Sequence, residues 1–248
     1  MHKFHFSIDD VLGSLLQLSD WNLKISQQPM LAFLGELHAE TGVKSDLYLF
    51  LQTIAADGRT RHLKELSGAA CEMLRSARHL RYGPHARDYQ TAPHAETVYE
   101  VTQGMTHLFE NIERFSTPDQ RSDWVRLHYF SELHELASFW TRHNVQALMT
   151  TDKPAVAYRF GQQEIEELTS TGKTEFNGLG FVRSNLRLEF FLEDAADPER
   201  FCARMDDHLA RQGFVTIFTH EDDLNDERVR KLVAAAARHA QELGIISD

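Results

Sequence analysis

Apolar and polar residues follow two different periods along the chain, and segments of the two kinds alternate. Between positions 4 and 9 the sequence F-H-F-S-I-D alternates between apolar and polar residues, which predicts a strand with one apolar face. Positions 47–51, L-Y-L-F-L, form a short apolar run typical of a strand covered on both faces. In residues 98–115 the apolar positions recur instead with the spacing of an amphipathic helix.

The same patterns continue to the C-terminus, with a less clear stretch between 151 and 181. Pro29 and Gly42 mark the start and the end of one predicted helix. Strands are predicted at 4–9, 47–51, 79–83, 124–129, 145–150, 181–189 and 213–219. Helices are predicted from near position 11, at 29–42, 63–77, 98–115 and 132–143, after Pro198, and in the Ala-rich C-terminal segment.

About seven strands that alternate with helices predict an α/β fold with a mostly parallel sheet and right-handed crossovers. A closed or nearly closed barrel and an open doubly wound sheet both fit this order. The sequence has no internal repeat, low-complexity segment or linker rich in Pro, Gly and Ser. We therefore predict a single domain over residues 1–248.

Composition and charge exclude several classes of partner. The 248 residues carry a net charge of -11, which disfavours both nucleic acid and anionic membrane surfaces. The two cysteines, Cys71 and Cys202, are far apart and indicate neither a disulfide framework nor a thiolate zinc site. We find no secretion signal and no apolar stretch of membrane-spanning length, so we expect a cytoplasmic protein. The oligomeric state is left open.

Acids, histidines and an arginine stand where the predicted strands end. In a parallel sheet or barrel, the carboxyl ends of the strands share one edge and ligands bind there. One carboxylate and two imidazoles can hold a divalent metal and leave a position open for water. A second carboxylate can act as a general base, and a separate histidine can protonate a leaving group. The segments concerned are Asp9-Asp10, Gly83-Pro84-His85, Arg126-Leu127-His128-Tyr129, Thr151-Asp152 and Thr219-His220-Glu221.

Each of these residues also has a plain structural interpretation. Asp9 and Asp10 could cap the helix that begins near position 11. His85 could be a solvated loop histidine, and His128 a hydrogen-bonded histidine of the core. Glu221, with the two aspartates that follow it, is interpreted as a solvated helix start favoured by the helix dipole.

Five short motifs, in this order, resemble those of the polysaccharide deacetylases. They are F-S-I-D-D-V at 6–11, T-G-V-K-S-D-L-Y-L-F at 41–50, R-Y-G-P-H-A-R-D at 81–88, R-L-H-Y at 126–129 and I-F-T-H-E at 217–221. The third and fifth look closest to a divergent branch of that family, one that is linked to surface-polysaccharide genes. The resemblance spans the whole chain, although each motif is short.

The resemblance implies an irregular or partly closed (β/α) barrel and a role for each matching residue. Asp9 would be the catalytic base, Arg126 would orient it, and His220 would be the catalytic histidine. Asp10 and His85 would be metal ligands. We expect one divalent metal, with zinc as the first choice and cobalt or nickel as alternatives.

One departure from the family pattern concerns the metal. The third motif normally has two histidines four residues apart, but Tyr89 stands four residues after His85. We predict His128 as the missing ligand, because it replaces a proline of the fourth motif, and His94 as the alternative. Further residues expected to contact the substrate are Tyr129, Asp152, Arg187 and Glu189.

The predicted function is metal-dependent hydrolysis that removes an acyl group, such as acetyl, from an amino sugar or polysaccharide precursor. A metal-dependent phosphoesterase would use similar ligands, often around two metals. A third hypothesis is a non-catalytic sugar-binding or assembly protein on the same fold, which the missing histidine of the third motif favours.

Overall fold

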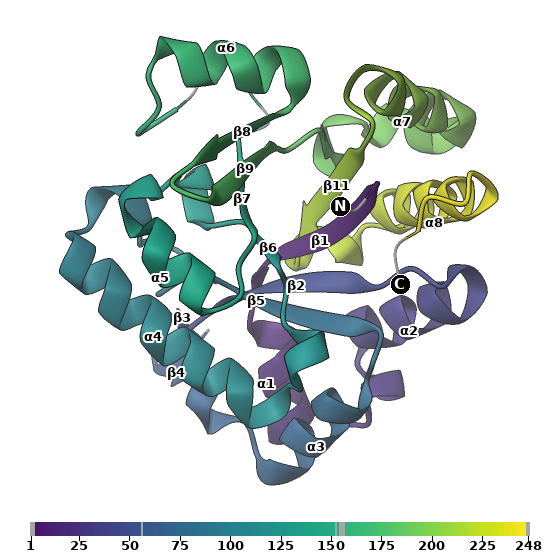
Figure 1. Ribbon diagram of the computed structural model, residues 1–248. Helices are drawn as coiled ribbons and strands as arrows, with labels where there is room; N and C mark the ends of the chain where they lie inside the picture. Colours follow the sequence, from purple (N-terminus) through teal and green to yellow (C-terminus); the bar gives the residue numbers. More distant parts are fainter. Residues whose placement is uncertain (1–2, 56, 152, 154–156, 247–248) are drawn as a thin grey trace.

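The computed structural model describes residues 3–55, 57–151, 153 and 157–246, and it consists of strands surrounded by helices (Figure 1). A five-stranded parallel sheet has the order β10-β11-β1-β2-β5, and a second sheet has the order β6-β7-β9-β8 with only β8 antiparallel. A separate hairpin joins β3 and β4. The strands are β1 Phe4–Val11, β2 Ser45–Phe50, β3 Gln52–Ile54, β4 Thr60–His62, β5 Leu80–Ala86, β6 Trp124–Val125, β7 Ala147–Thr150, β8 Lys173–Phe176, β9 Leu179–Arg183, β10 Leu186–Arg187 and β11 Val215–His220.

The helices cover the outer faces of these strands (Figure 1). They are α1 Gly13–Asp20, α2 Pro29–Thr41, α3 Gly68–Ser76, α4 Val98–Phe115, α5 Ala137–Arg142, α6 Gln162–Thr171, α7 Pro198–Gln212 and α8 Glu227–Glu242. Helix α2 has Pro29 in its first turn and ends at Gly42 in the left-handed conformation, as predicted from these two residues. Among the described residues, no helix combines the length and the apolar character needed to cross a bilayer.

The two larger sheets together form a barrel that hydrogen bonds do not fully close. Between β5 and β6 the only bridge recorded for the described residues joins Tyr82 and Arg121, with Ser122 N donating to Tyr82 O over 3.0 Å. On the other side, Asn185 connects the end of β9 to β11 by donating its backbone N–H to Thr216 Oγ1 over 2.8 Å. The predicted irregular, partly closed (β/α) barrel with mostly parallel strands is confirmed, and the open sheet is not.

Several predicted boundaries were wrong, and most of them lie near the strand ends. Strand β1 continues to Val11, and the helix predicted from near position 11 begins at Gly13. Strand β5 extends to Ala86, which places His85 inside a strand and not in a loop. The strand predicted at 124–129 ends at Val125, and the segment 181–189 forms two short strands followed by a 3-10 helix. The hairpin β3–β4, the strand β8 and the helix α6 were not predicted.

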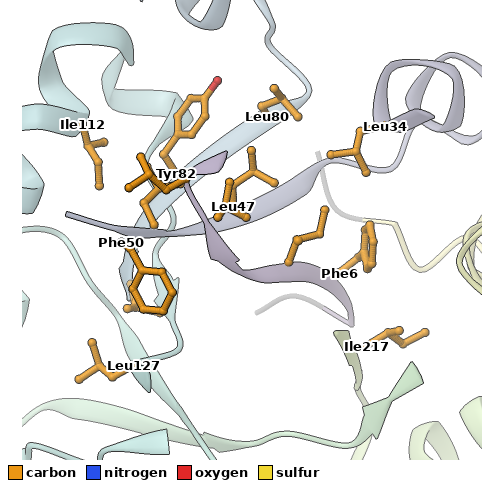
Figure 2. Close-up of a cluster of buried hydrophobic side chains, with 14 of the residues drawn as sticks. Phe6, Leu34, Leu47, Phe50, Leu80, Tyr82, Ile112, Leu127 and Ile217 are labelled. Carbon is orange, nitrogen blue, oxygen red and sulfur yellow. The ribbon is translucent and has the colours of Figure 1, made fainter. Parts of the chain in front are cut away.

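The core lies between the helices and the barrel strands. Figure 2 shows a part of it, with Leu34 of helix α2 near Phe6 of β1, and with Leu47 and Ile217 on the neighbouring strands β2 and β11. These four side chains are at most 2% exposed. Burial of one such side chain contributes roughly 1.5–3 kcal/mol. The continuous run of burial along β2 explains why its sequence is apolar without alternation.

Gly83 lies where the backbone of β5 passes close to the ring of Tyr48. A Cβ atom added at this glycine would lie 3.0 Å from Tyr48 Cδ1 and 3.2 Å from Ser122 Cβ. We expect Gly83→Ala to lower the free energy of unfolding by about 1–3 kcal/mol, because the buried ring cannot move away without strain. Chemical denaturation measures this change.

Gly104 is the matched control, since nothing lies within 4 Å of its added Cβ in helix α4. Gly104→Ala should raise the free energy of unfolding by roughly 0.5–1 kcal/mol through helix propensity. Equal effects of the two substitutions would contradict the close packing of Tyr48 on Gly83.

Candidate active site

Asp9 and Asp10 are neighbours in sequence, and both line the same cavity. In a regular strand, successive side chains point to opposite faces. Here the pairing of β1 with β2 shifts register between Ile8 and Val11, and Asp10 has a left-handed backbone with φ 63°. This irregularity, like a β-bulge, turns both carboxylates toward one side of the strand end.

His85 is held near the end of β5 with one ring nitrogen fixed by the backbone. Its Nδ1 lies 2.7 Å from the carbonyl oxygen of Arg126, and a carbonyl can only accept. The proton of the neutral ring is therefore on Nδ1. The bare Nε2 atom lies 3.0 Å from Asp10 Oδ1.

His128 is oriented in the same way, by a hydrogen bond from one ring nitrogen to a main-chain carbonyl. Its Nε2 lies 3.0 Å from the carbonyl oxygen of Tyr89 and donates to it. Its Nδ1 is then bare, 3.1 Å from His85 Nε2 and 3.4 Å from Asp10 Oδ1. Tyr89, which stands where the family pattern has a histidine, thus orients the other imidazole through its main chain.

These three atoms form a donor set that fits a metal cation. Tetrahedral zinc with ligand bonds of about 2.0–2.2 Å places its ligand atoms roughly 3.3–3.6 Å apart. The separations of Asp10 Oδ1, His85 Nε2 and His128 Nδ1, 3.0–3.4 Å, are close to this range. Among the described residues, none donates a hydrogen bond to the buried Asp10 Oδ1. Burial raises the pKa of Asp10, but the adjacent His128 and His85 lower it to well below its ordinary value. The carboxylate is therefore anionic, as a carboxylate that binds a metal must be.

The backbone is strained around this group. Six non-glycine residues in the described part of the chain have positive φ, and three of them are asparagines, which tolerate this conformation. The other three are Asp10, Tyr129 and Phe130, with φ of 63°, 56° and 57°. Strain of this kind persists only where the surroundings impose it, and it concentrates at functional sites.

Asp9 is fixed by a buried arginine inside the barrel. Arg126 is 1% exposed, and its Nη1 donates to Asp9 Oδ1 over 2.9 Å and to Ser7 Oγ over 2.8 Å. Its guanidinium carbon lies 3.9 Å from the centroid of the Phe218 ring. The charged pair is therefore held between strand β1 and the segment after β6, which leaves little freedom to the Asp9 carboxylate.

His220 ends strand β11 and is held by two carboxylates. Its Nδ1 lies 3.1 Å from both Glu189 Oε1 and Asp223 Oδ2. Burial lowers the pKa of His220, but Glu189 and the more distant Asp9 and Asp10 raise it to about 9. Burial and the adjacent Glu189 raise the pKa of Asp223 to about 6. His220 therefore carries a proton at neutral pH.

A cavity of about 410 Å³ brings these groups together. Its wall includes Asp9, Asp10, His85, Arg126, His128 and His220, and also Tyr129 and Arg187 of the expected substrate contacts. Glu189, also expected to contact the substrate, accepts hydrogen bonds from Thr219 Oγ1 and the His220 backbone N–H. His94 lies outside the donor set, with its ring stacked on Tyr158 at 3.6 Å. Asp152 lies outside the described residues.

Two residues of this region were missed or misinterpreted from the sequence. Asp223 follows His220 by three residues, and this spacing was a usable signal for a contact. Glu221 is not solvated: its carboxylate accepts hydrogen bonds from the backbone N–H groups of Leu12, Gly13 and Ser14. Those partners are more than 200 positions away, so no local pattern could reveal them.

Several solved structures resemble this chain in the arrangement of their helices and strands. A 4-α-glucanotransferase from Thermococcus litoralis matches 97% of this chain and 39% of its own length, with 13% identity and a TM-score of 0.57. A mutant CE4 family pseudoenzyme with restored enzymatic activity matches 98% of this chain and 64% of its own, with 12% identity and a TM-score of 0.52. A peptidoglycan N-acetylglucosamine deacetylase matches 98% and 83%, with 10% identity and a TM-score of 0.52.

The chain has the fold of the CE4 polysaccharide deacetylases. No protein-family model and no curated protein matches the sequence, which agrees with the low identities. This chain spans less than two thirds of the first two structures that it resembles. At such identities the likeness shows the deacetylase fold alone. Since one neighbour is described as a pseudoenzyme, activity must be argued from the site residues.

The carboxylate of Glu189 moves the pH at which His220 loses its charge to a higher value. Because the pKa of His220 is raised above the ordinary 6.5, its protonation stabilises the folded protein fully below pH 6.5. This contribution is lost as the pH rises through 9. We expect Glu189→Gln to lower the free energy of unfolding by about 1–3 kcal/mol at pH 6, and by less at pH 9.5.

Denaturation curves at several pH values, with NMR titration of His220, test this expectation. Asp206→Asn is the matched control, because Asp206 pairs with His239 at 2.7 Å on the surface. Its effect should stay below about 1 kcal/mol, as is usual for exposed pairs. A His220 pKa that does not change in Glu189→Gln would contradict the assigned contact.

Proposed function

We propose that this protein is a metal-dependent hydrolase that removes an acyl group from an amino sugar or a polysaccharide precursor. The observation that carries the proposal is the convergence of Asp10 Oδ1, His85 Nε2 and His128 Nδ1 in a cavity that Asp9 and His220 also line. A divalent cation held by Asp10, His85 and His128 would supply a Lewis acid for the acyl carbonyl and would make a bound water more acidic. The cavity and the deacetylase fold support an acylated sugar as the substrate class.

The chain's own residues provide the proton transfers. Asp9 is a carboxylate whose position is fixed by Arg126, and it can take a proton from an attacking water. His220 is protonated at neutral pH and can give its proton to a departing amine. The candidate base and the candidate acid thus have different neighbours, Arg126 for Asp9 and Glu189 for His220, so the two groups can take separate roles in general acid–base catalysis.

A second candidate is a phosphoesterase with two metals, which one observation favours. Glu189, His220 and Asp223 form another group of residues whose ligand atoms are close enough to hold a cation. In that case His220 would be a ligand and could not act as the acid. A non-catalytic sugar-binding protein has less support, because His128 supplies a second imidazole in place of the histidine missing at Tyr89.

Metal stoichiometry distinguishes these hypotheses. We expect the wild type to bind about one equivalent of zinc in calorimetric titration. Asp10→Asn and His128→Asn should each lower the affinity by at least about 100-fold, because each removes a direct ligand. The matched control His94→Asn should bind zinc like the wild type. Two equivalents would favour the phosphoesterase, and none would favour the binding protein.

The reaction class is tested by following the released product. With an N-acetylated amino-sugar oligomer and zinc, we expect release of acetate, and none of phosphate from phosphomonoesters. Asp9→Asn should reduce kcat by about 10²–10⁴-fold with little change in zinc affinity, because it removes the base and keeps the ligands. Release of phosphate, or full activity of Asp9→Asn, would contradict the proposal.

A further inference from the structure

Glu221 connects the two strands that carry the candidate base, one metal ligand and the candidate acid. It directly follows His220 at the end of β11, beside the end of β1 (Figure 1). Its backbone N–H donates to the carbonyl oxygen of Asp9 over 3.0 Å. Its carboxylate accepts from Leu12 N and Gly13 N, each over 3.0 Å, and from Ser14 N.

Helix α1 depends on this distant carboxylate for its cap. The residue before the helix is Leu12, which has no side-chain acceptor, and the first turn contains no acidic residue. The first N–H groups of a helix need acceptors and favour a negative charge. Glu221 provides both from a position 207–209 residues further along the chain.

The contacts of Glu221 lie on both sides of the strained residue. Asp9 precedes Asp10, and the three capped N–H groups follow it within four residues. The left-handed backbone of Asp10 costs free energy, and contacts that fix the segment on both sides help to offset this cost. In the register of β1 with β11, Asp9 is directly paired with His220. Movement of this segment would therefore change the positions of Asp9 and Asp10 relative to His220.

We propose that Glu221 is a positioning residue of the active site, which holds the Asp9–Asp10 segment in place against His220. The role of Glu221 in catalysis rests on the proposed function, whereas its role in the geometry of the site rests on the contacts alone. Glu221 touches neither the substrate nor the metal in this scheme. It acts through the backbone on both sides of Asp10.

The experiment compares Glu221→Ala with Glu100→Ala. Glu100 is a matched control, because its carboxylate also accepts a backbone N–H at a helix start, that of Thr97 over 2.9 Å, far from the cavity wall. Zinc affinity is measured by calorimetry and the pKa of His220 by NMR in metal-free protein, with His220→Asn to assign the signal. Thermal unfolding records the loss of stability in each variant.

We expect Glu221→Ala to weaken zinc binding by about tenfold or more, as supporting residues of metal sites do. The pKa of His220 should fall by roughly half a unit or more, because the carboxylates of Asp9 and Asp10 move away from it. Glu100→Ala should change neither quantity. If Glu221→Ala lowers only the thermal stability, and zinc affinity and the His220 pKa stay at wild-type values, the proposal is overturned.

Two further outcomes must be distinguished from failure of this proposal: failure of the proposed function, and failure of the variant to fold. If the wild type binds no zinc, the proposed function fails, and the His220 titration alone decides the role of Glu221. If Glu221→Ala does not fold, Glu221→Gln replaces it, because an amide keeps one acceptor but turns an NH₂ group toward the N–H groups of α1. Wild-type values in Glu221→Gln would then overturn the inference.

Discussion

The site depends on three atoms with lone pairs that the backbone forces together. His85 and His128 each donate one ring N–H to a main-chain carbonyl, so their bare nitrogens face Asp10 Oδ1 and each other. Without a positive charge between them, these atoms would repel one another at 3.0–3.4 Å. The fold thus builds a cavity wall whose electrostatics favour a cation.

Residues that line or flank the cavity hold these three atoms in place. Asp10, Tyr129 and Phe130 adopt a conformation that most side chains avoid, and all three line or flank the cavity. Each such residue costs of order 1–3 kcal/mol, which the surrounding contacts must offset. The buried pair of Arg126 and Asp9 belongs to these contacts, since breaking it would leave a charge inside the barrel.

The sequence predicted element types well where burial was continuous or strongly periodic, as in β2 and α4. At β5 it predicted the strand but placed its end too early, at Gly83, with a loop from Pro84 onward. The structure gives the reason: Gly83 lets the Tyr48 ring pack against the backbone, and Pro84 lies in a strand whose side toward β6 lacks a regular ladder. His85 therefore lies inside a strand that was predicted to end two residues before it, at Gly83.

For the site, the rule that parallel strands gather their carboxyl ends identified Asp9, Asp10, His85 and His220 as members of one group. That rule cannot describe contacts between distant segments. Glu189 was expected to face the substrate, but it holds His220, and Glu221 was expected in solvent, but it caps α1. Both residues contact partners that are distant in sequence, and the spacing of residues along the chain does not reveal such contacts.

The substitution at position 89 shows why a missing motif residue does not decide whether a site is lost. Tyr89 cannot ligate a metal through an imidazole, yet its carbonyl oxygen orients His128, which comes from a different part of the barrel. Position 89 thus provides a carbonyl acceptor, and the second imidazole of the candidate site comes from His128 in a neighbouring segment. What a metal site requires is a set of oriented donor atoms, and here the set is kept while its sequence pattern is not.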